Sequence, residues 1–184
     1  AQILNLRKDL KIKLLRGNVD TRIKKLRENN YDAIILSLAG LKRLELQDQV
    51  TEKLNKEQFL PAACQGTIGV QSKIANDIRE VFKVINHNET EIESLTERQV
   101  LKNINANCNS PVSVYAEITE NKLSLKCDIF DHDGNKLFSK KVSDSKENYL
   151  KIADTLSETI LNDLGQDKIN KLDELNDFDY TPKA

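Results

Sequence analysis

The stretch VSVYAEITENKLSLKCDIFDHDGNKLFSKKV, Val112–Val142, alternates apolar and polar residues through most of its length. Such alternation is the period-two pattern of strands that bury one face. Asn121 and the pair Asp133-Gly134 interrupt the pattern, and both are typical of turns. The stretch therefore predicts three strands of an antiparallel meander, at residues 112–118, 122–130 and 136–142.

Helical patterns flank this meander on both sides. Asn88–Ile104 carries apolar residues three and four apart, and Asn88 with Glu91 predicts a capping box at its start. Glu147–Leu164 repeats an apolar face and ends at Gly165, a common residue after a helix. We therefore predict a small α+β domain over residues 86–165, in which helices pack against the three-stranded sheet. The polar residues 166–184 are expected to form a partly disordered tail.

The first half of the chain shows a different order of elements. Lys11–Leu15 alternates Lys with Ile and Leu, and Tyr31–Ala39 is a nearly continuous apolar run, so both predict strands. Helices are predicted at Thr21–Asn29 and from Gly40 onward. Strand, helix, strand, helix is typical of an α/β fold with a parallel sheet. The predicted fold class is thus α/β followed by α+β.

A segment without a helical period joins these two parts. Phe59–Gln71 holds two glycines and is predicted to be extended, whereas Asn76–Ile85 has an apolar face at helical spacing. We expect residues 61–85 to cross between an incomplete α/β part at residues 1–60 and the α+β domain.

The charge of the chain is unevenly distributed. The net charge is −1, yet residues 1–43 hold eleven Lys or Arg against four Asp or Glu. Such a basic segment favours an anionic partner, namely a nucleic acid, a phosphate or a polycarboxylate. Only Tyr31 is aromatic there, whereas surfaces for single-stranded nucleic acid interleave aromatic and basic residues. The pattern favours a small polyanion, and a solvated basic face remains the alternative.

Three arginines lie beside the ends of the predicted N-terminal strands: Arg16, Arg22 and Arg43. In open α/β sheets the strand ends line the ligand crevice. The planar guanidinium binds two oxygens at once, which suits carboxylate or phosphate groups. Ion pairing at the surface is the alternative for each of them.

The three cysteines differ in their sequence settings. None belongs to a CxxC motif, so neither a zinc site nor a disulfide framework is expected. Cys108 lies in a predicted helix–strand loop, a setting that often carries chemistry. Cys127 alternates within a predicted strand and is expected to be a small core residue. Cys64 can be either reactive or structural.

The composition limits the classes of protein to which the chain can belong. The chain has 184 residues, of which 39% are hydrophobic and none is Met. Because a natural reading frame begins with Met, we expect the chain to be a fragment of a longer protein. Its longest apolar run, Ala33–Leu36, is too short to cross a bilayer, and no leader sequence opens the chain. These features predict a cytoplasmic protein without a membrane partner.

Four ordered blocks of the sequence resemble the porphobilinogen deaminase (hydroxymethylbilane synthase) family. The first three are similar to RGNVxTRLxKL, YDAIILAxAGLxRL and LPAxGQGAxGIE of that family. The fourth is similar to its cofactor-loop signature ERxxLxxLxGGCxxPIGxxA, although Ala106 and Asn107 replace the two glycines. The corresponding blocks here are RGNVDTRIKKL at Arg16–Leu26, YDAIILSLAGLKRL at Tyr31–Leu44, LPAACQGTIGVQ at Leu60–Gln71 and ERQVLKNINANCNSPVSVYA at Glu97–Ala116.

The resemblance implies a transferase of porphyrin and haem biosynthesis. It joins four porphobilinogen molecules into hydroxymethylbilane with release of ammonia, on a covalent dipyrromethane cofactor that a thioether attaches to Cys108. The carboxylates of the growing oligopyrrole would be held by Arg16, Arg22 and Arg43, and Asn18 and Gln65 would line the same cleft. The parent enzyme is expected to be a monomer with no nucleic-acid partner and no metal.

The resemblance also implies a fold and a role for each part of the chain. Residues 1–60 would be part of an α/β domain like those of periplasmic binding proteins, and residues 61–85 would belong to a first domain that is absent here. Residues 86–165 would be the cofactor-attachment domain. Because the family's catalytic aspartate lies in the first domain, the chain alone is expected to be inactive. A non-catalytic module that binds small polyanions, or an inert interaction domain at residues 86–165, are the alternatives.

Overall fold

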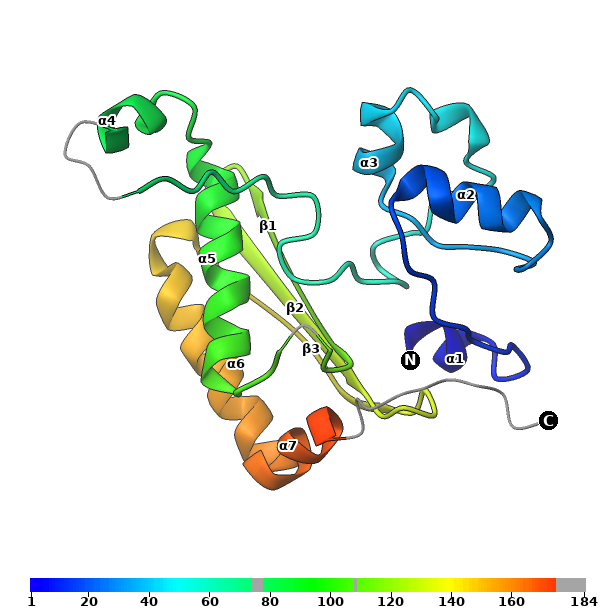
Figure 1. The fold of residues 1–184 in the computed structure, drawn as a ribbon. Coiled ribbons are helices and arrows are strands. Elements are labelled where there is room, and N and C mark those ends of the chain that lie inside the picture. The colour runs from blue at the N-terminus through cyan, green and yellow to red at the C-terminus, as the bar shows by residue number, and fades with distance from the viewer. Residues whose placement is uncertain (74–77, 108, 175–184) are drawn as a thin grey trace.

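The structure is a computed structural model, and it describes residues 1–73, 78–107 and 109–174 (Figure 1). Helices dominate the described residues, and the strands are confined to the second half of the chain. In chain order the elements are α1 Gln2–Leu6, α2 Val19–Arg27, α3 Leu38–Arg43, the 3-10 turn η1 Gln47–Gln49, α4 Ile78–Lys83, α5 Asn88–Asn103, β1 Val112–Thr119, β2 Lys122–Phe130, β3 Lys136–Ser145, the 3-10 turn η2 Lys146–Asn148, α6 Tyr149–Leu164 and α7 Gln166–Glu174.

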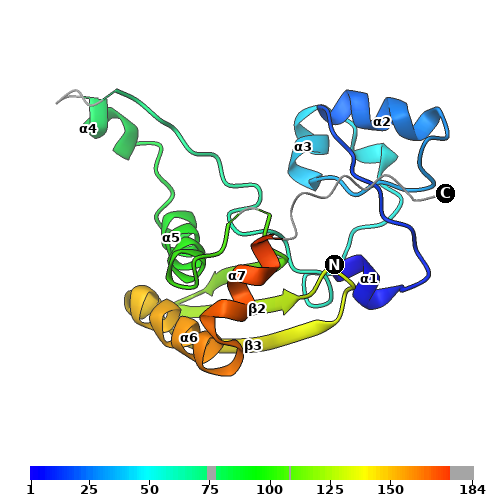
Figure 2. The same cartoon turned by 60° about the horizontal axis from the view of Figure 1, so that its bottom comes forward.

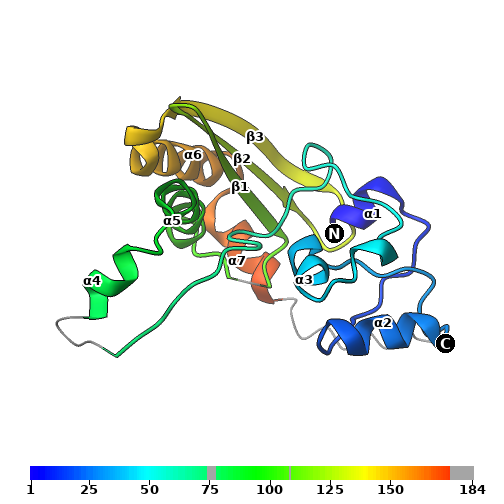
Figure 3. The same cartoon turned by 90° about the horizontal axis from the view of Figure 1, so that it is seen from above.

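The predicted meander is confirmed. Its three strands are antiparallel in the order β1-β2-β3, and Val114 pairs with Cys127, which in turn pairs with Lys140. Helices α5 and α6 lie side by side across one face of the sheet (Figures 1 and 3). The opposite face is predominantly polar, because the alternation places residues such as Ser124 and Lys126 there.

The main core lies between this sheet and its two helices. Alternate strand residues point toward the helices, and the helices contribute one apolar stripe each, so that the side chains interlock without water. Cys127 is completely buried among them, which confirms its prediction as a core residue. The fully buried members include Val100, Ile104, Val114, Leu123, Leu125, Ile129, Leu156 and Ile160.

The start of α5 differs from the predicted capping box. His87, and not Asn88, is the N-cap, and its Nδ1 accepts a hydrogen bond of 3.2 Å from the backbone N–H of Thr90. Glu91 accepts instead from the amide of Asn86 at 2.5 Å. An imidazole nitrogen thus takes the role that the sequence suggested for the Asn88 amide.

The residues after Gly165 form a helix where a polar tail was expected. In α7 the side chains of Ile169 and Leu172 are buried in the main core. Gln166 donates a 3.0 Å hydrogen bond to the carbonyl oxygen of Ile104, the residue that ends α5. Two apolar residues in a polar stretch are too weak a pattern to predict this helix, because its stability comes from tertiary packing. We call residues 86–172 the sheet domain, and residues 175–184 lie outside the described part.

The two predicted N-terminal strands are not formed. No described residue before Val112 belongs to a strand, and the end of the predicted strand Tyr31–Ala39 is instead the start of α3. Segments 11–15 and 31–37 are joined only by a 3.0 Å hydrogen bond from the Tyr31 hydroxyl to the carbonyl oxygen of Leu14. A strand needs a neighbour for its backbone groups, and neither segment has one here. The expected α/β fold of residues 1–60 is therefore not present.

Only a small core holds the N-terminal half together. Ile23 and Leu41 are buried where α2 and α3 meet, whereas Leu14 is 58% exposed and Ile68 is 69% exposed. We call residues 11–54 the N-terminal lobe. Figures 1 and 2 show it apart from α5 and α6, and α4 extends from the other side of the structure.

Helix α1 packs on the turn between β2 and β3. The amide of Asn5 donates a 2.8 Å hydrogen bond to the carbonyl oxygen of Gly134. A Cβ atom at Gly134 would lie 2.6 Å from the backbone of Leu4 and of Asn5, closer than real contacts allow. Gly134 also has φ of 80°, which other residues rarely adopt. The close approach of α1 therefore requires glycine at this turn.

This contact predicts that Gly134→Ala destabilises the fold more than Gly165→Ala. Both glycines have positive φ, 80° and 77°, but a Cβ at Gly165 would have no neighbour within 4 Å. We expect Gly165→Ala to cost about 1–3 kcal/mol of unfolding free energy, because its φ of 77° and ψ of 149° form a conformation that essentially only glycine adopts. Gly134→Ala should cost a further 1–3 kcal/mol or so from overpacking. Urea unfolding measures both, and equal losses would contradict the close packing of α1.

Candidate functional site

The first turn of α2 gathers three of the predicted site residues. Asn18 is its N-cap, and its side-chain oxygen accepts a 2.9 Å hydrogen bond from the backbone N–H of Thr21. The guanidinium of Arg22 donates to the carbonyl oxygen of Gly17 at 2.7 Å. The exposed Arg16 precedes this turn directly. Asn18 and Arg22 thus already fix the local backbone beside Arg16.

Arg43 lies at the end of α3, a helix whose first turn contacts that of α2. A Cβ atom at Gly40 would lie 3.7 Å from the Val19 side chain, so the first turns of the two helices are in contact. Arg43 follows Gly40 by one helical turn and is exposed. Arg16, Asn18 and Arg22 therefore lie at the start of α2 and Arg43 lies on the neighbouring α3, without the strand ends that the sequence predicted beside them.

Gln65 lies elsewhere, in a turn that is attached to α5. Its backbone N–H donates to the carbonyl oxygen of Ala62 at 3.0 Å. The hydroxyl groups of Thr67 and Ser94 lie 3.3 Å apart, within hydrogen-bonding distance. No hydrogen bond or ion pair of the described residues joins Gln65 to the arginines, so the structure does not bring the whole predicted cleft together.

Cys108 lies outside the described residues, and the residues on either side of it form a hydrogen-bonded turn. The backbone N–H of Asn107 donates to the Ser110 hydroxyl at 2.8 Å, and that of Asn109 donates to the Asn107 side chain at 2.8 Å. Beyond them, the Pro111 carbonyl accepts from the N–H of Phe130 at 3.0 Å. The candidate attachment loop is therefore anchored to the sheet where it enters β1.

Glu97 is a residue that the sequence did not single out. It is only 5% exposed, and its carboxylate accepts hydrogen bonds from the backbone N–H of Cys64 at 2.5 Å and of Ala116 at 2.8 Å. Burial raises the pKa of Glu97. Its only sequence signal is that it begins the block that contains Cys108. Glu97 links α5, β1 and the turn that carries Gln65.

Neither described thiol is activated. Burial raises the pKa of Cys64, and its Sγ lies 3.7 Å from the carbonyl oxygen of Ser94. Cys64 has φ of 58°, a conformation that favours glycine, and the similar family motif has glycine at this position. Burial also raises the pKa of Cys127, which is fully enclosed. Both groups are therefore thiols and not thiolates at neutral pH.

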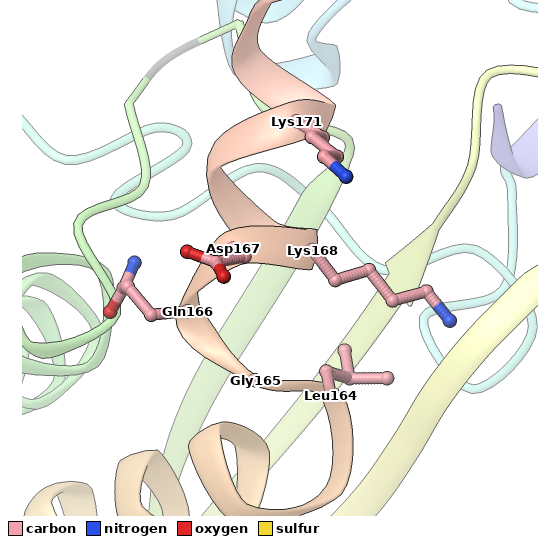
Figure 4. Close-up of a pocket in the computed structure, with 6 residues that line it drawn as sticks. All are labelled: Leu164, Gly165, Gln166, Asp167, Lys168 and Lys171. Carbon is pink, nitrogen blue, oxygen red and sulfur yellow. The ribbon is translucent and has the colours of Figure 1, made fainter.

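One hollow among the described residues lies away from all of these side chains. It is a shallow depression of about 540 Å³ at the junction of α6 and α7 (Figure 4). Its lining includes Lys168 and Lys171, which point outward, and the Gly165 backbone. Because it contains none of the predicted site residues, we do not assign the function to it.

Two further properties concern the described residues only. They contain no cluster of three His, Cys, Asp or Glu side chains that could hold a metal ion. None of the helices described is long and apolar enough to span a bilayer.

Two family models match successive parts of the chain. The model described as "Porphobilinogen deaminase, dipyromethane cofactor binding domain" matches residues 1–80, and that described as "Porphobilinogen deaminase, C-terminal domain" matches residues 91–162.

Curated relatives agree with these models. A porphobilinogen deaminase of Clostridium acetobutylicum is 36% identical over 163 residues, which are 89% of this chain and 55% of the relative. That of Clostridium botulinum strain Langeland is 36% identical over 163 residues, 89% of this chain and 56% of the relative. That of Nitratiruptor is 34% identical over 177 residues, 95% of this chain and 56% of the relative. The chain thus spans little more than half the length of these relatives.

The bonds of Glu97 predict a specific effect of the isosteric change Glu97→Gln. The amide offers one acceptor for two backbone N–H groups and turns its NH₂ toward the other. We expect a loss of about 1–3 kcal/mol of unfolding free energy, with faster amide exchange at Cys64 or Ala116. Glu91→Gln on the exposed side of α5 is the matched control, because its oxygen can still accept from Asn86. Equal urea midpoints for the two variants would contradict the role of Glu97.

Proposed function

Because the chain belongs to the porphobilinogen deaminase family, we propose that it supplies two parts of a transferase that polymerises porphobilinogen into hydroxymethylbilane. One part carries arginines for the substrate carboxylates, and the other carries the cofactor loop. The observation on which this depends is the order of the two family matches, at residues 1–80 and 91–162. We place the enzyme in the cytoplasm and expect the complete protein to act as a monomer.

Cys108 is proposed to carry the dipyrromethane through a thioether bond. The two described thiols support this by elimination, because burial raises the pKa of both Cys64 and Cys127 and so reduces their nucleophilicity. The loop also follows α5, whose position Glu97 fixes against β1. Each elongation step would join one porphobilinogen to the attached chain and release one ammonia.

The carboxylates of the oligopyrrole are proposed to bind at the N-terminal lobe. Arg16 and Arg43 are exposed, and Arg22 lies in the first turns of α2, which contacts the helix that carries Arg43. The excess of eleven basic over four acidic residues in residues 1–43 suits a product with many carboxylates. Asn18 and Gln65 are proposed to contribute polar contacts, with Gln65 reaching the ligand from the α5 side.

The N-terminal half is proposed to complete an α/β domain in the longer protein. Segments 11–15 and 31–37 have strand-forming sequences but no strand neighbours here. Ile68 and Val70 in the crossing segment are more than half exposed, as expected for residues that pack against a further part of the protein. We propose residues 1–60 as part of a domain like those of periplasmic binding proteins, and residues 61–85 as part of another.

A second candidate function is a non-catalytic module that binds small polyanions. The exposed Arg16 and Arg43 on a basic lobe favour it, because binding alone needs neither a cofactor nor a catalytic acid. The two functions differ in one observable: only the transferase forms a covalent adduct.

The first prediction from this proposal concerns Cys108. A chimera that places the N-terminal part of the Clostridium acetobutylicum relative before residue 1 should consume porphobilinogen and gain the mass of two pyrrole units. The chain by itself should do neither, because catalysis needs all groups in one cleft. Cys108→Ser should abolish both signals in the chimera, whereas Cys64→Ala should retain them. Peptide mapping of the adduct to Cys64 or Cys127 would refute the assignment.

The second prediction concerns the arginines. In the same chimera, Arg16→Leu, Arg22→Leu and Arg43→Leu should each weaken elongation by about 1–3 kcal/mol, the contribution of a charge-assisted hydrogen bond. Mass spectrometry should then show bound intermediates that stall at different lengths. Lys24→Leu, which removes a charge that pairs within α2, is the control. Wild-type kinetics for all three arginine variants would mean that these residues are exposed to solvent and do not bind the substrate.

A further inference from the structure

The N-terminal lobe joins the sheet domain through its two ends. The amide nitrogen of Gln2 donates to the carbonyl oxygen of Leu60 and to the Ser113 hydroxyl, both at 2.8 Å. The amide oxygen of Gln2 accepts from the backbone N–H of Leu60 at 2.9 Å. One side chain therefore joins the two segments that flank the lobe, residues 1–10 and 55–60, and fixes them to β1, a junction that we call the Gln2–Leu60 clip. Figure 3 shows both ends reaching the sheet away from α5 and α6.

Beside this clip, two charged residues of opposite sign contact the polar face of the sheet. Lys56 donates hydrogen bonds of 2.7 Å to the Tyr115 hydroxyl and to the Glu117 carboxylate, and its Nζ lies 4.8 Å from the centre of the Tyr115 ring. The Glu57 carboxylate lies 3.7 Å from Lys126 and 3.6 Å from Lys141. The charges alternate across this contact: Lys56 pairs with an anion of β1, and Glu57 pairs with cations of β2 and β3.

Most of the charged side chains in this contact are exposed to solvent. The side chains of Lys56 and Glu117 are 55% and 50% exposed, and that of Glu57 is 68% exposed. Ion pairs at such positions are weak individually and are screened by salt. Hydrogen bonds to Glu117 and Tyr115 raise the pKa of Lys56, so its charge is secure at neutral pH.

No hydrogen bond or ion pair of the described residues joins the lobe itself, residues 11–54, to the sheet domain. The polar attachments lie in the segments on either side of the lobe, at Gln2, Asn5, Lys8, Lys56 and Glu57. Its polar contacts are internal, such as the 2.9 Å hydrogen bond from Arg27 to Gln49 and that from Tyr31 to Leu14. A body that is held only at its base can rotate as a unit when the contacts beside the base are broken.

We propose that the ion pairs of Lys56 with Glu117, and of Glu57 with Lys126 and Lys141, act as a latch that holds the N-terminal lobe in one orientation. When these ion pairs break, the lobe rotates about the Gln2–Leu60 clip. The use of this movement rests on the proposed function. The lobe carries Arg16, Arg22 and Arg43, whereas the loop of Cys108 belongs to the sheet domain. A swing changes the distance between them, which a growing oligopyrrole requires.

The experiment measures the distance between lobe and sheet domain in this chain without any substrate. Donor and acceptor dyes are attached through non-canonical amino acids at Asp20 on α2 and Asp163 on α6, which are both exposed. At low salt the wild type should show one narrow distribution of energy-transfer efficiency, and it should lose that narrow peak at about 1 M salt, where the screening length is roughly 3 Å. Lys56→Glu should lose the peak already at low salt.

Two further variants separate the latch from general effects. The double variant Lys56→Glu/Glu117→Lys restores a pair of opposite charges, and the Tyr115 hydroxyl can donate to the new carboxylate, so the narrow peak should return. Lys24→Glu changes the same charge within the lobe, where Lys24 pairs with Glu28, and should leave the peak narrow. Circular dichroism unfolding verifies that each variant is folded.

The outcomes are distinct. The latch is refuted if Lys56→Glu matches Lys24→Glu, or if the double variant remains as broad as Lys56→Glu. Neither result bears on the family assignment, because no substrate is present. An inactive chimera with the expected energy-transfer pattern would instead refute the proposed function and leave the latch in place.

Discussion

The free edge of β1 imposes the main constraint on this structure. An edge strand presents backbone N–H groups that must find acceptors when other elements cover them. On α5, Glu93 accepts from Ile118 at 2.8 Å, and Glu97 accepts from Ala116 at the same distance. The second oxygen of Glu97 then holds the backbone of Cys64. Two carboxylates one helical turn apart thus satisfy the edge and attach the crossing segment to it.

The two faces of the sheet explain how the rest of the chain is arranged. The apolar face is filled by α5, α6 and α7, whose packing is tight and independent of charge. The other face is mostly polar, and the N-terminal residues meet it through Gln2, Lys56 and Glu57. One face of the sheet is therefore covered by apolar packing, and the other is contacted through polar side chains. The movement that we propose for the lobe takes place on the second face.

The sequence predicted the elements whose signals are local. The alternation in Val112–Val142 gave the correct meander, and the helical periods gave α5 and α6, because each of these patterns reflects burial against a neighbour close in the chain. The strands predicted at Lys11–Leu15 and Tyr31–Ala39 failed for the opposite reason, since a strand exists only where another strand accepts its hydrogen bonds. Helix α7 was missed because only Ile169 and Leu172 mark its buried side in the sequence, and its hydrogen bond to Ile104 joins residues far apart in the chain.

The features of the candidate site were also only partly predictable from the sequence. Arg16, Asn18, Arg22 and Arg43 could be grouped from motifs, and in the structure Asn18 and Arg22 form hydrogen bonds at the start of α2, directly after Arg16. The two hydrogen bonds of Glu97 could not be predicted, because they join residues far apart in sequence through backbone atoms that carry no sequence signal. The backbone conformation of Cys64 could be predicted in part. The family motif has glycine at this position, which indicates a positive φ, and Cys64 has φ of 58° in the structure.

The Gln2–Leu60 clip closes the N-terminal lobe into a loop with adjacent ends. Its two hydrogen bonds span 58 positions in the chain, so both ends of the loop meet the sheet domain at nearly one point. Closing a loop costs only about 0.6 kcal/mol more for each doubling of its length. Inserted bodies with adjacent ends can therefore be lengthened, shortened or exchanged with little effect on their host. In evolution and in protein engineering, the body that holds the candidate arginines and the body that holds the candidate attachment loop could vary separately, provided that this junction is kept.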